Sequence, residues 1–72
     1  MKRLRSISGK DCVKILCNKF GFNVLRQKGS HVILKKNGDG TVVPMHSELR
    51  IGTLKNIPEL AKVSEEDFAE EL

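Results

Sequence analysis

The residues best suited to chemistry lie in one short segment, Arg26-Gln27-Lys28-Gly29-Ser30-His31. Histidine side chains ordinarily titrate near neutrality, so His31 is suited to accept or donate a proton. RNA supplies its own nucleophile, the 2′-hydroxyl, so a ribonuclease needs little more than such proton transfer beside positive charge. The groups that could stabilise the phosphate are Arg26, Lys28 and the backbone amides of Gly29 and Ser30. The segment therefore fits a general acid/base among RNA-binding residues.

Two alternatives remain open for the histidines. A single histidine beside a turn is more often a surface residue without a catalytic role, so the segment alone does not establish catalysis. His46 follows Pro44 and Met45 at the end of the third predicted strand. A three-stranded meander brings that end close to the start of the second strand, where His31 lies. His46 could act as a second acid/base, but a role in anchoring the following loop is favoured.

The charge is divided unevenly along the chain, whose formal net charge is +4. Residues 1–36 hold ten basic residues and one acidic residue, whereas residues 37–72 hold three basic and eight acidic residues. This division suggests an anionic ligand at one end of the domain, and nucleic acid is the commonest such ligand. Lys10, on the outer face of a predicted helix, joins the RNA-binding candidates. The alternative is that these lysines only form solvated faces.

Other chemistries are poorly supported by the sequence. The acidic residues cluster in the C-terminal half in a helix-cap pattern and offer no paired metal site. Cys12 and Cys17 are five residues apart on a predicted helix, a geometry that separates their Cα atoms beyond the reach of a disulfide. No second Cys/His pair completes a set of zinc ligands. We therefore expect free thiols, and neither a metal nor a cofactor.

The chain is long enough for one small domain and no more. Its 72 residues include 39% hydrophobic residues and three phenylalanines, which is enough for one sheet face covered by helices. No apolar run approaches the roughly 20 residues of a membrane span, and no apolar signal-peptide segment follows the N-terminus. No basic helix carries the broad exposed apolar face that would bind a membrane surface. We expect a soluble, cytoplasmic domain over residues 1–72 with no membrane partner.

The elements that must position these residues begin with a helix. Ser8 can cap it by accepting a hydrogen bond from the Asp11 amide, apolar residues follow at helical spacing, and Gly21 can end it. The pattern then changes to period two, which predicts strands at the ranges 22–27, 31–36 and 41–46. Turns are predicted at 28–30 and 37–40, and Pro44 must end the third strand or lie at a sheet edge.

Two further helices are predicted after the strands. Gly52 and Thr53 offer a cap for the first, and Pro58 is expected to distort its first turn or make it restart. Ser64 caps a last short helix. The predicted fold is α+β: an α-β-β-β-α order with a three-stranded antiparallel sheet, helices on one face and a short C-terminal helix. Double-stranded-RNA-binding domains are built in this way, and they bind RNA through its shape, phosphates and 2′-hydroxyls.

Several short motifs resemble those of one toxin family. They are Ser8-Gly9-Lys10-Asp11, Gly21-Phe22, Arg26-Gln27-Lys28-Gly29-Ser30-His31, Val43-Pro44-Met45-His46 and Gly52-Thr53-Leu54. Over about residues 4–68 the chain is similar to the HicA toxins, small messenger-RNA interferases of toxin–antitoxin pairs. The resemblance implies a fold like the double-stranded-RNA-binding domain, metal-independent RNA cleavage with His31 as the catalytic histidine, and a HicB-like antitoxin that covers the active site. Val32 stands where family members often have a second histidine.

These observations together predict an endoribonuclease that acts on mRNA, is a monomer when free, and is inhibited by a HicB-like antitoxin. Its general acid/base is expected to be His31. Its RNA-binding residues are expected to be Lys10, Arg26, Lys28, Gly29 and Ser30. One alternative is a non-catalytic RNA-binding module of the same fold, and another is a protein-interaction domain whose ligand is an acidic partner surface.

Overall fold

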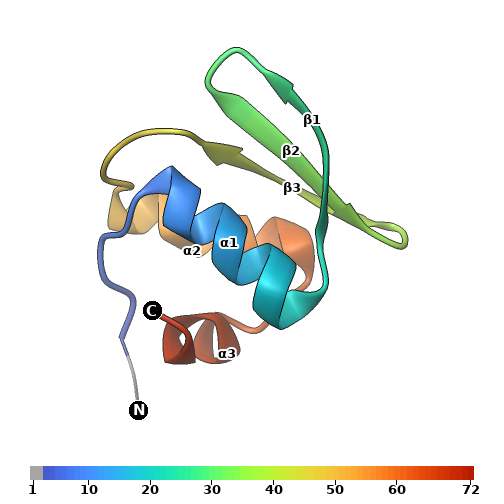
Figure 1. The fold of residues 1–72 in the computed structure, drawn as a ribbon. Coiled ribbons are helices and arrows are strands. Elements are labelled where there is room, and N and C mark those ends of the chain that lie inside the picture. Colours follow the sequence, from blue (N-terminus) through green and yellow to red (C-terminus); the bar gives the residue numbers. More distant parts are fainter. Residues whose placement is uncertain (1–2) are drawn as a thin grey trace.

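The order of elements along the chain is the predicted one. In the computed structural model, which describes residues 3–72, the elements are α1 (Gly9–Phe20), β1 (Asn23–Lys28), β2 (His31–Lys36), β3 (Asp39–Pro44), α2 (Ile51–Ala61) and α3 (Glu65–Glu70) (Figure 1). The predicted α-β-β-β-α order with a C-terminal helix is therefore confirmed. Met1 and Lys2, the latter one of the ten basic residues of the N-terminal half, lie outside the described residues.

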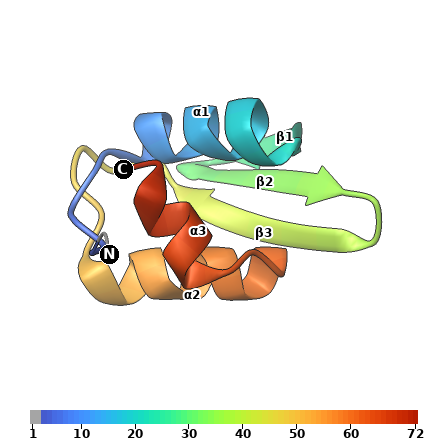
Figure 2. The ribbon, with the colours of Figure 1, turned by 90° about the horizontal axis from the view of Figure 1, so that it is seen from below.

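The molecule is built in layers. The three strands form one antiparallel sheet in the order β1-β2-β3. Helices α1 and α2 lie side by side on one face of this sheet, and α3 crosses the helical layer on the side away from the strands (Figures 1 and 2). No helix within residues 3–72 covers the other face of the sheet, which we call the open face. The core therefore lies between the sheet and α1 and α2, with α3 closing its far side.

Local side-chain chemistry sets both ends of α1. The Ser8 hydroxyl oxygen accepts a hydrogen bond from the Asp11 amide (3.0 Å), and Gly21 ends the helix in the left-handed conformation with φ 76°. Both features are as predicted. The apolar face of the helix buries Cys12 and Leu16 completely, so the helix is held on the sheet mainly by the burial of apolar surface.

The strand boundaries differ from the prediction at the second turn. The turn comprises only Asn37 and Gly38, because Asn37 takes the left-handed conformation with φ 56° and reverses the chain in two residues. Strand β3 therefore begins at Asp39 and ends at Pro44, so the predicted turn over 37–40 and the predicted strand over 41–46 were wrong by two residues. Pro44 both ends β3 and lies on an edge strand, where a residue without an N–H is tolerated.

The start of α2 was predicted wrongly, and so was the effect of its proline. The helix begins at Ile51 and its N-cap residue, Arg50, makes no side-chain hydrogen bond, so Gly52 and Thr53 do not cap it. The preceding residue explains this start: Leu49 is buried, and its amide donates a hydrogen bond to the Ile7 carbonyl (2.8 Å). A long-range contact therefore fixes where the chain enters the helix.

Pro58 lies inside α2 without interrupting it. Its side chain is fully buried, so packing of the ring against the core offsets the one helical hydrogen bond that proline cannot make. The expected distortion or restart at Pro58 was therefore wrong. The last helix follows the prediction, because the Ser64 hydroxyl accepts from the Asp67 amide (3.3 Å) and Phe68 is buried.

Candidate functional site

His31 is accessible on the open face of the sheet. It is the first residue of β2, where it pairs with Lys28 of β1 and with Pro44 of β3. Successive residues of a strand alternate between faces, and the buried residues of β2 are Val32 and Leu34. The side chain of His31 therefore lies on the face opposite the helices, and the residue is exposed.

A β-bulge places the two predicted phosphate-binding cations on the same face as His31. The register shifts between Val24 and Arg26, so that Arg26 pairs with Ile33 and Lys28 pairs with His31. Cross-strand partners in an antiparallel pair share one face. Without the extra residue at the bulge, the pairing of Val24 with Leu34 would continue and would direct Arg26 and Lys28 toward the helical side. The bulge thus assembles the group of Arg26, Lys28 and His31.

Lys35 also belongs to this surface, although the sequence analysis did not select it. It lies four residues after His31 on β2, hence on the same face, and pairs with Gly40 of β3 and Asn23 of β1. Apolar residues on both faces hid the alternation in the sequence; only the burial of the neighbouring positions reveals it. We call Arg26, Lys28, His31 and Lys35 the basic cluster of the open face.

The turn before His31 is held in place from two sides. Gly29 and Ser30 form a two-residue turn, in which Gly29 has φ 60°, a conformation that glycine adopts without strain. The Gln27 side-chain amide donates a hydrogen bond to the Gly29 carbonyl (3.0 Å). The Met45 amide donates to the Ser30 carbonyl (2.6 Å), which ties the turn to the chain after β3.

The N-terminus of α1 is joined to the same end of the sheet. The Gly9 amide donates a hydrogen bond to the His46 carbonyl (2.9 Å), and Gly9 is packed against the backbone of Pro44 and Met45. His46 is exposed and lies two residues beyond the end of β3. The bond that anchors its loop is therefore made by its backbone carbonyl.

Lys10 follows Gly9 on α1 and is exposed. The structure therefore connects Lys10 and His46 to the turn before His31 through backbone contacts, whereas Arg26 and Lys28 share a sheet face with His31. Gly29 and Ser30 form the turn that joins Lys28 to His31.

The charges of the basic cluster are free of carboxylate partners within residues 3–72. The one salt bridge there joins Lys19 to Glu71 at 3.9 Å, on the helical side of the molecule. The acidic residues of the C-terminal half include those that open α3, namely Glu65, Glu66 and Asp67. Because α3 lies on the far side of the helical layer (Figure 1), these three carboxylates are on the opposite side of the molecule from the basic cluster.

Neither cysteine contributes to this surface. Both are free thiols on α1, and burial raises the pKa of Cys12 to about 12. A thiol with that pKa is protonated at neutral pH and is a poor nucleophile. No group of three or more His, Cys, Asp or Glu residues within residues 3–72 is arranged to hold a metal ion. None of the helices in that range has the length and apolar character needed to span a membrane.

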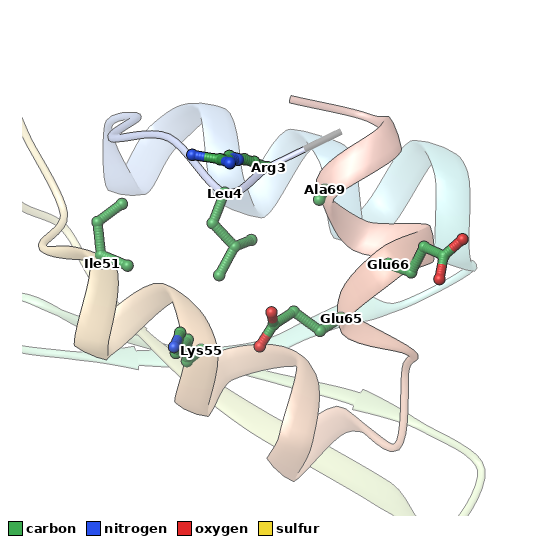
Figure 3. A pocket seen from close by; sticks show the side chains of 7 residues that line it. All are labelled: Arg3, Leu4, Ile51, Lys55, Glu65, Glu66 and Ala69. Carbon is green, nitrogen blue, oxygen red and sulfur yellow. The ribbon is translucent and has the colours of Figure 1, made fainter. Parts of the chain in front are cut away.

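One hollow in the described surface lies away from the basic cluster. Figure 3 shows this hollow, of about 640 Å³, between the N-terminal segment, α2 and α3. Its lining residues are Arg3, Leu4, Ile51, Lys55, Glu65, Glu66 and Ala69, none of them from the sheet. His31 therefore stands on an open surface, which suits a polymeric ligand better than a small molecule.

The fold and this surface define a small α+β domain that presents an accessible histidine among unpaired cations on an open sheet. The chain belongs to the family described as HicA toxin of bacterial toxin-antitoxin systems, whose model matches residues 9–63. The match includes α1, the whole sheet and α2, and it confirms the resemblance inferred from the motifs. The protein is thus the toxin of a toxin–antitoxin system, with an antitoxin as its partner. No curated protein and no solved structure matches the chain.

Proposed function

We propose that this toxin is an mRNA interferase, an endoribonuclease that uses His31 as its general acid/base and needs no metal. The observation that carries the proposal is the register of β1 and β2, which puts His31 on an open face beside Lys28 and near Arg26. A histidine accessible to solvent can exchange protons with a substrate. Cations on the same face can bind the phosphate and stabilise the charge that develops on it during cleavage.

The reaction requires only groups that RNA and this surface supply. The ribose 2′-hydroxyl loses its proton and attacks the adjacent phosphorus; a P–O2′ bond forms, the P–O5′ bond breaks, and the leaving 5′ oxygen takes up a proton. The products are a 2′,3′-cyclic phosphate and a 5′-hydroxyl. His31 performs one of the two proton transfers, and a water molecule performs the other. Val32 cannot serve, because it is an apolar residue buried under the helices.

The proposal is tested by replacing each histidine separately. His31→Gln should lower the rate of RNA cleavage by about 10²–10⁴, and the free energy of unfolding should change by no more than about 0.5 kcal/mol because the residue is exposed. His46→Gln is the matched control: it should keep most of the activity, since the backbone carbonyl anchors the loop. Assays contain a chelator. Full activity of the folded His31→Gln variant would contradict the proposal.

The alternative of a non-catalytic RNA-binding module is favoured by one feature, the valine that stands beside His31 in place of a second histidine. RNA binding without cleavage by the wild-type protein would select this alternative.

We propose that the antitoxin is HicB-like and covers the basic cluster. We also propose that the toxin and its complex are located in the cytoplasm. An acidic surface on the partner can bind the several unpaired cations of this cluster. Co-expression with the adjacent reading frame should give a complex whose stability falls with salt concentration. Failure to obtain any complex would remove this part of the proposal.

A further inference from the structure

All three phenylalanine side chains of the protein pack in or against its interior. The chain has three phenylalanines and neither tryptophan nor tyrosine. Phe22 and Phe68 are 3% and 0% exposed, and the half-buried ring of Phe20 packs against Phe68 with a distance of 6.3 Å between the ring centroids. None of the three belongs to a strand. Among the strand residues, the imidazole of His31 is therefore the one aromatic ring on the open face, and the proposed function places that ring at the ribose and phosphate rather than on a base.

What the open face does offer is a set of cations around an aliphatic centre. Arg26 and Lys28 lie two residues apart on β1, and Lys35 lies four residues from His31 on β2. At roughly 3.3 Å per residue, His31 and Lys35 are about 13 Å apart along the strand. Between them, Ile33 pairs with Val42, which is 39% exposed. The cations can contact phosphates at several points, whereas the aliphatic centre can form no hydrogen bond with a base edge.

We propose that the open face binds RNA through its sugar–phosphate backbone, without base stacking, so that the identity of the bases contributes little to affinity. This inference rests on the proposed function in taking RNA as the ligand, and it adds the mode of recognition. Proteins that stack bases on aromatic rings lose roughly five- to 150-fold in affinity for each base that is no longer stacked. Here the affinity should instead follow the number of phosphates that the basic cluster contacts.

Besides His31, Arg26 is the one residue of the basic cluster whose cationic group is planar, so it provides a control. A guanidinium can stack on a base, but the ammonium of lysine cannot. Arg26→Lys keeps the positive charge and removes the planar surface. Any change in affinity should therefore be the same for strands with and without bases, whereas Arg26→Gln should weaken binding to all strands and reduce its salt dependence.

The experiment measures binding by fluorescence anisotropy with the wild-type protein, on strands whose 2′-hydroxyls are methylated so that they bind without being cleaved. The probes are 12-nucleotide strands of A, of U and of abasic ribose phosphate, and an RNA duplex, each titrated over a series of KCl concentrations. The three single strands should bind within about threefold of one another. The slope of log K against log salt should be about −2, as expected for three phosphate contacts to a single strand. Tighter binding of the duplex would assign an A-form backbone, and weaker binding a single-stranded one.

Failure of this inference is distinguishable from failure of the proposed function. If the abasic strand binds more than tenfold weaker while the wild-type protein still cleaves RNA, base contacts contribute to affinity and the inference is wrong. The proposed ribonuclease activity is then still supported. If all strands bind equally and the wild-type protein cleaves no RNA, the inference is supported and the proposed ribonuclease activity is wrong. If no strand binds, both are wrong.

Discussion

Replacing Gly9 by alanine tests whether the end of α1 and the end of β3 hold the turn before His31. A Cβ atom added to Gly9 would be directed into the carbonyl oxygen of Pro44 and would lie 2.9 Å from the Cα atom of Met45. Real Cβ atoms essentially never approach backbone so closely, and backbone cannot rotate away as a flexible side chain can. The methyl group must therefore push α1 and this segment apart.

The expected loss of stability follows from the contacts that this movement breaks. Overpacking a close contact costs about 1–3 kcal/mol, and weakening the hydrogen bond from the Gly9 amide to the His46 carbonyl costs about 1 kcal/mol more. Alanine recovers about 0.5–1 kcal/mol through its higher helix propensity. The net loss should be about 2 kcal/mol, which for a domain of this size lowers Tm by about 8–16 °C.

The control is Gly52→Ala, because Gly52 also lies in the first turn of a helix but nothing is within 4 Å of its added Cβ. This variant should gain about 0.5–1 kcal/mol. Both variants are measured by thermal and urea unfolding. The Gly9 variant should also cleave RNA more slowly, because Met45 is bonded to Ser30, the neighbour of His31. Equal stability of the two variants would refute the argument from close packing.

Two further predictions concern the turn and the buried thiol. Gly29→Ala should cost about 1–2 kcal/mol in urea unfolding, because Gly29 has φ 60°. Gly38→Ala should cost almost nothing, since the other hairpin places its positive φ at Asn37, and equal costs would contradict the assignment. Burial raises the pKa of Cys12 from 9.0 to about 12, so above pH 9 the thiol ionises in the unfolded chain but not in the folded protein. Stability should fall by up to about 1.4 kcal/mol per pH unit between pH 9 and 12. Cys12→Ala should remove that part of the fall, and identical pH profiles of the two proteins would show that the burial has no such effect.

The sequence was sufficient wherever a structure depends on neighbouring residues. The hydroxyl groups of Ser8 and Ser64 cap helices by accepting hydrogen bonds from amides three residues further along the chain. Gly21 and Gly29 occupy the left-handed conformations that their positions require. The element order, the antiparallel meander and the chemical types in the Gly-Ser-His segment could all be predicted for this reason. The family followed from the same motifs and is confirmed by the match to residues 9–63.

Local rules failed where a distant contact decides the outcome. The start of α2 depends on Leu49 and its hydrogen bond to Ile7, which is far away in the sequence. The continuity of α2 through Pro58 depends on burial of the ring in a core that other elements supply. Each of these is a tertiary contribution that overrides a local preference, so no pattern within the helix itself could have predicted it.

The sequence by itself determined which functional groups the surface carries, but the tertiary structure decided which of them face the same way. The side chains of a strand alternate between two faces, so one extra residue in β1 moves Arg26 and Lys28 from one side of the sheet to the other. The bulge is a property of how β1 pairs with β2, and the open face is defined by where α1 and α2 pack. Lys35 of β2 belongs to the cluster because α1 and α2 pack on the opposite face of its strand. Pairing and packing are interactions between segments distant in the chain, and they turn a list of basic residues into a surface.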